Sequence, residues 1–146
     1  MSLLDTPLDG GCLCGRVRYR VDPGAVTVAY CHCTQCRRAS GAPVSLWATV
    51  HPARWRLTRG ALAWYAVGAR AERGFCPHCG AQLVFRFTGQ DEEIDVAVGT
   101  LDTPDALPPQ YHVYTGTRLA CMAALAPELP AWTDHGPDAP PPTDAA

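Results

Sequence analysis

Apolar and polar positions alternate in short runs along the first hundred residues. The run 15–21 places three apolar residues on one face and three arginines on the other. Alternation with a period of two is typical of half-buried β-strands. Similar runs, rich in Val, Trp, Tyr and Phe and bounded by Gly or Pro, follow at 25–30, 44–50, 54–58, 61–66, 81–87 and 94–99. The pattern predicts a mostly β domain of short antiparallel strands, as a sandwich or a curled, tent-like sheet.

Two further segments complete the predicted organisation. A short stretch at about 34–41 fits a single helical turn. From Thr103 onwards the composition changes, because nine of the fourteen prolines lie between Pro104 and Pro142. We expect a loop-rich C-terminal wrap within one domain, 1–136, and a disordered Pro/Ala-rich tail over 137–146.

The composition excludes several classes of protein. The chain has 146 residues, of which 47% are hydrophobic and 18% charged, as in an ordinary globular domain. No stretch approaches the roughly 20 apolar residues of a membrane helix. The N-terminus has neither the basic region nor the apolar core of a secretory signal. We therefore expect a cytoplasmic protein with no membrane partner.

Charge is distributed unevenly along the chain. Residues 1–86 carry a net +7 and residues 87–146 a net −9, which gives −2 for the whole chain. The negative total, and the absence of a basic run longer than Arg37-Arg38, argue against a nucleic-acid partner. The basic half favours an anionic ligand. For most of the arginines, however, a solvated strand face or pairing with the acidic C-terminal half is the better explanation.

The eight cysteines indicate metal chemistry. Without a secretion signal, a disulfide framework is not expected. Gaps of one or two residues suit chelation better than disulfides between neighbours. Seven of the eight fall into three such clusters, at Cys12 and Cys14, at Cys31, Cys33 and Cys36, and at Cys76 and Cys79, whereas Cys121 stands alone.

The first and last clusters predict one closed, structural zinc site. Structural zinc takes four ligands in a tetrahedron, and a glycine after each Cys pair lets the backbone turn through positive φ. An extended strand would hold the sulfurs of an i, i+2 pair about 7 Å apart, so the chain must bend at Leu13. The site would tie the first strand to a much later hairpin, with ligands Cys12, Cys14, Cys76 and Cys79. The alternative is a set of buried, reduced cysteines.

The middle cluster predicts a second, reactive zinc. Three thiolates in a tight loop leave a fourth position open, as in catalytic zinc sites, and such a site can hold an incoming thiol as its thiolate. Alternatively His32, His112 or Cys121 closes the site and makes it structural. The sequence thus predicts two zinc ions per chain, one structural and one catalytic and labile, with the catalytic ligands Cys31, Cys33 and Cys36.

The three clusters and their flanks resemble the glutathione-dependent formaldehyde-activating enzyme family, which includes the centromere protein V group. The resemblance covers about residues 10–101 and continues with His112-Val113 and Leu129-Pro130. It departs from the family at Arg118–Met122, where members often carry a Pro-Trp pair. The motifs are Gly11-Cys12-x-Cys14-Gly15, Tyr30-Cys31-His32-Cys33-x-x-Cys36-Arg37-x-Ala39-Ser40-Gly41, Phe75-Cys76-Pro77-x-Cys79-Gly80 and Ile94-Asp95-Val96-x-x-Gly99-Thr100-Leu101.

The resemblance implies a zinc-stapled β-tent and a carbon–sulfur lyase-type activity. In that family, glutathione condenses with formaldehyde to S-hydroxymethylglutathione. By motif position, the four-cysteine set matches the structural zinc ligands and the middle cluster the catalytic ones. The implied partners are a small thiol, such as glutathione, and a small aldehyde.

Two other functions fit the sequence less well. The main alternative is a non-enzymatic zinc-binding interaction module on the same fold, and a B-type methionine sulfoxide reductase would need Cys121 as its catalytic thiol. The setting of Cys121 favours a small buried residue instead. His32 and His78 are expected to be solvated loop residues, and His112 is the one histidine to test as an acid. Exposed sheet edges can pair with a second copy of the chain, so the sequence is compatible with a dimer as well as a monomer.

Overall fold

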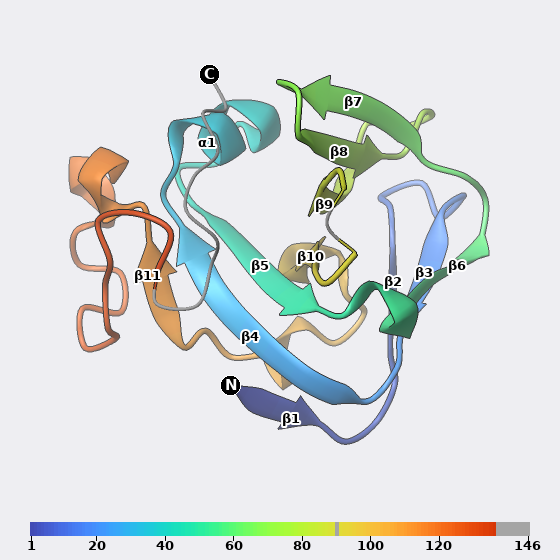
Figure 1. Cartoon of the computed structure of the whole chain (residues 1–146), viewed down its shortest axis with the longest axis horizontal. Helices are drawn as coiled ribbons and strands as arrows, with labels where there is room; N and C mark the ends of the chain where they lie inside the picture. Colours follow the sequence, from blue (N-terminus) through green and yellow to red (C-terminus); the bar gives the residue numbers. More distant parts are fainter. Residues whose placement is uncertain (90, 137–146) are drawn as a thin grey trace.

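The computed structural model describes residues 1–89 and 91–136 as two β-sheets and one short α-helix (Figure 1). The large sheet runs in the order β1 (Ser2–Leu4), β4 (Gly24–Cys31), β5 (Ser45–Val50), β10 (Ile94–Ala97), β9 (Gln82–Phe87), β8 (Ala71–Phe75) and β7 (Ala63–Val67). The small sheet contains β2 (Leu8–Gly11), β3 (Arg18–Val21) and β6 (Trp55–Arg59). All these neighbours pair antiparallel.

The remaining elements are short. Helix α1 (Thr34–Ser40) follows β4, and strand β11 (Tyr111–Val113) pairs parallel with the second half of β4. The described residues also contain five 3-10 turns, η1 (Pro52–Arg54), η2 (Val98–Thr100), η3 (Pro104–Ala106), η4 (Thr115–Thr117) and η5 (Ala120–Met122). In Figure 1, α1 and β11 lie beside β4, away from the small sheet.

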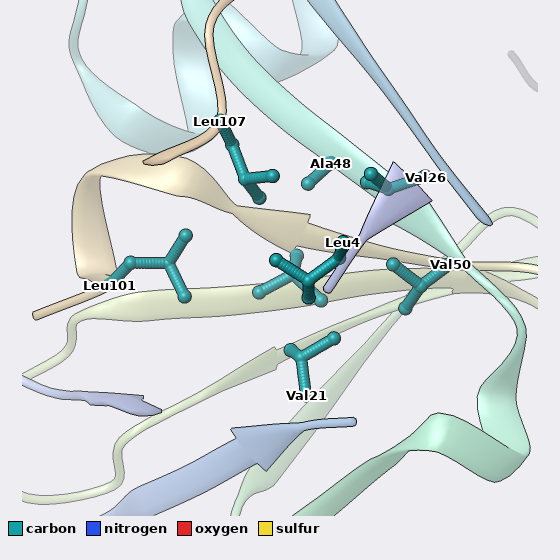
Figure 2. A pocket seen from close by; sticks show the side chains of 8 residues that line it. Leu4, Val21, Val26, Ala48, Val50, Leu101 and Leu107 are labelled. Atoms are coloured by element: carbon teal, nitrogen blue, oxygen red, sulfur yellow. The ribbon is translucent and has the colours of Figure 1, made fainter. Parts of the chain in front are cut away.

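The main core lies between the two sheets. Strand β3 contributes Tyr19 and Val21, which pack in one cluster with large-sheet residues such as Val28, Val84 and Val96. Figure 2 shows a small apolar void within this core, lined from both sheets by Leu4, Val21, Val26, Ala48, Val50, Val96, Leu101 and Leu107. Burial of this apolar surface is the main force that holds the sheets together.

The opposite face of the large sheet carries a second, smaller cluster. Residues alternate in direction along a strand, so the neighbours of core residues point to this face. The cluster contains Cys31 and Trp47 from the sheet and Cys36 from α1, and Phe85 of β9 packs against it. The fold therefore places the middle cysteine cluster on the sheet face that does not form the main core.

The predicted mostly β fold is confirmed, and all seven predicted runs contain strands. The first begins only at Arg18, because the residues before it form a turn at the first cysteine cluster. Four strands were not predicted, namely β1, β2, β8 and β11. Within the described residues, no helix has the length and apolar character needed to cross a bilayer. The predicted disordered tail, 137–146, lies outside the described residues.

The aromatic residues of the predicted strands are not all buried. Trp47 is buried, but Trp64 and Tyr65 are exposed on β7, an edge strand of the large sheet. The guanidinium of Arg86 covers the ring of Trp64, 4.0 Å from its centroid. The apolar alternation at 61–66 therefore predicts the strand correctly but not its burial.

Candidate functional site

Four cysteines from two turns, one in each sheet, lie close together. Cys12 and Cys14 lie in the turn between β2 and β3, and Cys76 and Cys79 lie in the turn between β8 and β9. The two turns are built alike. The amide of Gly15 donates to the carbonyl of Cys12 (3.2 Å) and that of Gly80 to the carbonyl of Cys76 (2.9 Å). Both glycines have positive φ, +77° and +75°, as the Cys-Gly pairs predict.

The sulfur positions fit a tetrahedral thiolate site. The Sγ atoms of Cys12 and Cys14 lie 3.5 Å apart, and those of Cys14 and Cys76 lie 3.8 Å apart. Tetrahedral zinc with Zn–S bonds near 2.3 Å separates neighbouring sulfurs by about 3.8 Å. All four sulfurs lie within 4.8 Å of one another. The cluster can therefore hold a thiophilic metal ion such as zinc, and an ion bound there would link the two sheets.

The middle cluster is built around the start of α1. Cys31 ends β4, Cys33 is the N-cap of α1, and Cys36 lies in its first turn. The amide of Cys36 donates to the Sγ of Cys33 (3.2 Å), and the Sγ atoms of Cys31 and Cys36 are 3.7 Å apart. Gly41 ends the helix with φ +71°, and its amide donates to the carbonyl of Arg37. The end of β4 and the start of α1 thus hold three thiols together, and they fit one metal ion.

A buried cation lies beside this cluster. Arg73, on β8, is only 6% exposed, and its Nη2 lies 3.5 Å from the Sγ of Cys36. Hydrogen bonds shared with Cys31 and Cys33 lower the pKa of Cys36, and the charge of Arg73 lowers it further. The positive charge therefore favours the thiolate form of Cys36. Arg73 was not among the predicted site residues, because the strand that carries it was not predicted.

On the same sheet face, four residues lie in register across four neighbouring strands, and three of them are polar. Arg73 pairs in register with Phe85, Phe85 with Asp95, and Asp95 with Thr49. The guanidinium of Arg73 lies over the ring of Phe85, 5.0 Å from its centroid, and Thr49 donates to Asp95 Oδ1 (2.5 Å). Burial raises the pKa of Asp95 to about 7. This carboxyl group can therefore change its protonation state near neutral pH.

Of the two histidines that were expected to be solvated, one is buried. His32 is 2% exposed rather than solvated, and its Nε2 is 2.9 Å from the Nδ1 of His112. The Nε2 of His112 donates to the carbonyl of Ala126 (3.0 Å). Both ring nitrogens of His112 are therefore engaged within the protein. His78 is exposed, as expected.

No fourth protein ligand joins the middle cluster among the residues that the structure describes. The group of metal-binding atoms there consists of three cysteine sulfurs. Two of the alternative ligands, His32 and His112, hydrogen bond to each other, and the third, Cys121, is exposed on η5. The expectation that Cys121 is buried is wrong, because the C-terminal wrap leaves η5 on the surface.

Several arginines form ion pairs with acids. These pairs are Arg18 with Asp102, Arg20 with Asp9, Arg56 with Asp22, and Arg86 with Glu72. Of these acids, only Asp102 belongs to the acidic half of the chain. The predicted pairing with that half is thus observed in one of these four pairs.

Comparison with known proteins agrees with this geometry. The family model described as "Glutathione-dependent formaldehyde-activating enzyme" matches residues 7–117, which include both cysteine sites and His112. The chain belongs to this family. A search of curated proteins found no match.

The chain is also similar to a solved structure. The crystal structure of a protein from Rhodobacter sphaeroides is 31% identical in sequence and superimposes with a TM-score of 0.54. The alignment covers 64% of this chain and 87% of that one. The similarity therefore extends over most of the Rhodobacter protein and supports the fold described above.

Proposed function

We propose that the protein is a zinc-dependent, carbon–sulfur lyase-type enzyme that condenses glutathione with formaldehyde to S-hydroxymethylglutathione. Cys12, Cys14, Cys76 and Cys79 would hold a structural zinc, and Cys31, Cys33 and Cys36 a catalytic one. The observation that carries the proposal is the middle cluster: three thiols, no fourth ligand among the described residues, and a buried arginine alongside.

The donor set decides what each cluster can do. Four cysteines complete a tetrahedron, so the first site is closed and contributes mainly to folding. Three cysteines leave one position for an incoming ligand. When bound there, zinc supplies a Lewis acid that favours the thiolate form of an incoming thiol.

The chain's own residues supply position and charge. Helix α1 fixes two of the three thiols within one turn, and His32 anchors the loop between Cys31 and Cys33 through His112. The charge of Arg73 favours an anionic guest at the cluster. The reaction proceeds slowly in water without a catalyst, so orientation and thiolate formation are sufficient contributions from the protein.

The proposal is tested by following adduct formation from glutathione and formaldehyde by NMR. A mildly acidic pH is best, because free glutathione is then mostly protonated and the uncatalysed rate is low. The zinc-loaded protein should accelerate the reaction, Cys33→Ser should not, and the matched variant Cys121→Ser should behave like the parent. Cys121 is an exposed thiol outside both clusters.

Two results would contradict the proposal. No acceleration by fully zinc-loaded protein would favour the alternative, a non-enzymatic zinc-binding module. Equal acceleration by a folded Cys33→Ser variant would place the activity elsewhere. The cytoplasmic location and the absence of a nucleic-acid partner stay predictions from the sequence.

A further inference from the structure

Arg73 is a buried cation with unused hydrogen-bonding capacity. Its side chain lies between β8 and α1, with Nη2 against the Sγ of Cys36 and the guanidinium over Phe85. Its Nη1 is fully buried and has no hydrogen-bond partner among the residues that the structure describes. Buried polar groups nearly always have a partner, so this nitrogen points to a ligand.

The neighbouring acids do not supply that partner. Glu72, the preceding residue, pairs with Arg86. Asp95 lies across Phe85 in the register of the sheet and accepts a hydrogen bond from Thr49. A buried guanidinium binds an anionic oxygen strongly, because the hydrogen bond is charge-assisted and the surroundings exclude water.

The position of Arg73 restricts which oxygen it can bind. The two terminal nitrogens of a guanidinium share one carbon, so Nη1 is held close to the cysteine cluster along with Nη2. On the proposed function, the glutathione sulfur arrives at this cluster. The aldehyde oxygen is then separated from that sulfur by one carbon, whereas both carboxylates of glutathione are many bonds away. The aldehyde oxygen is therefore the group that can reach Nη1.

We propose that Arg73 Nη1 binds the aldehyde oxygen and stabilises the alkoxide that forms when the glutathione sulfur attacks. This inference rests on the proposed function. In the step, a sulfur lone pair forms the C–S bond and the π pair of the C=O bond moves to oxygen. The alkoxide then takes one proton from solvent, which replaces the proton that the thiol released on binding. No further reactant is needed.

The test compares Arg73→Gln and Arg73→Lys with the matched control Arg70→Gln. Arg70 precedes the same strand and is exposed. Loss of one oxyanion donor typically lowers kcat by about 100-fold or more, so we expect that loss in Arg73→Gln. In Arg73→Lys, which keeps the positive charge beside Cys36, zinc content and the Kd for glutathione should stay within threefold of the parent. Arg73→Lys keeps the positive charge but lacks the two terminal nitrogens of the guanidinium, so its kcat should also fall at least tenfold. This variant keeps the test valid if the Gln variant does not fold.

A second readout does not depend on turnover. Formate is a planar one-carbon anion that resembles formaldehyde but carries a negatively charged oxygen. In a titration with zinc-loaded protein and glutathione, the line width of the carbon-13 signal of formate should show saturable binding. The same binding is expected with Arg70→Gln, and none with Arg73→Gln.

Several outcomes would overturn the inference. These are an unchanged rate or unchanged formate binding in Arg73→Gln, and, in Arg73→Lys, a tenfold weaker Kd for glutathione in place of a lower kcat or loss of zinc from the middle cluster. If the parent protein itself gives no acceleration, the proposed function fails. The formate titration still decides whether Arg73 binds a one-carbon oxyanion.

Discussion

His32 and His112 form a buried hydrogen bond of 2.9 Å between residues that are 80 positions apart. Because the carbonyl of Ala126 can only accept, the Nε2 of His112 carries a proton. In a neutral His112 ring the Nδ1 is then an acceptor, and the Nε2 of His32 donates to it. This chain of bonds links the loop of the middle cysteine cluster to the C-terminal wrap.

Removal of the His112 ring should destabilise the protein. In His112→Leu the buried Nε2–H of His32 loses its acceptor, which typically costs about 1–3 kcal/mol. Urea unfolding of the zinc-loaded protein measures this loss. The control His51→Leu changes an exposed histidine and should lower the free energy of unfolding less than His112→Leu does. Equal decreases in the two variants would show that the buried hydrogen bond makes no specific contribution to stability.

The two cysteine sites should respond differently to loss of a ligand. Cys76 is fully buried between the sheets, so Cys76→Ser should unfold or strongly destabilise the whole domain. Cys33→Ser should leave a folded protein that has about one zinc fewer and no longer binds thiol. Circular dichroism and elemental analysis of both variants measure these outcomes. An unfolded Cys33→Ser protein would contradict the division into a structural and a reactive site.

Asp95 should make stability depend on pH. Its pKa is about 7 in the folded protein because of burial, against 3.8 for the ordinary side chain. Between these values the folded protein keeps a proton that the unfolded chain releases, so the free energy of unfolding falls as pH rises. Asp95→Asn cannot ionise. Its stability relative to the parent should therefore increase from pH 5 to 7 and level off above pH 7.

Asp9 provides the control for this measurement. A hydrogen bond from Arg20 lowers the pKa of Asp9, so this residue is ionised in both states above pH 5. The stability of Asp9→Asn relative to the parent should have no slope between pH 5 and 8. A flat profile for Asp95→Asn as well would show that Asp95 ionises normally in the fold.

Close packing around Gly10 should make that position intolerant of a side chain. A Cβ added there would lie 2.4 Å from the hydroxyl of Tyr19 and 2.7 Å from the carbonyl oxygen of Thr100. Gly10→Ala should therefore destabilise the fold by about 1–3 kcal/mol, measured by thermal unfolding. Gly99→Ala is the matched control, because a Cβ there meets nothing within 4 Å. Equal stability of the two variants would contradict this packing.

The cysteine sites were predictable because their information is local. Gaps of one or two residues and the following glycines specify a chelating turn, and the structure contains both turns at Gly15 and Gly80. The helical turn after Cys33 was predictable for the same reason, since Gly41 ends it in the left-handed region.

The residues around the middle cluster depend on non-local pairing. Arg73 lies on β8, whose sequence Ala-Glu-Arg-Gly-Phe has too much charge and glycine to signal a buried strand. His32 is buried only because β11 pairs with β4 and brings His112 beside it. Neither short-range spacing nor hydrophobic alternation carries this information, so the sequence predicted the cysteine clusters but not their surroundings.

On the proposed function, the middle cluster is a reactive, thiol-binding metal site distinct from the closed four-cysteine site. The most direct test of this division is zinc per chain by elemental analysis, before and after dialysis against glutathione. We expect two zinc ions per chain, of which one is labile or displaced by glutathione, and a single glutathione-resistant zinc in Cys33→Ser. Two tightly held zinc ions that are indifferent to glutathione would contradict the division.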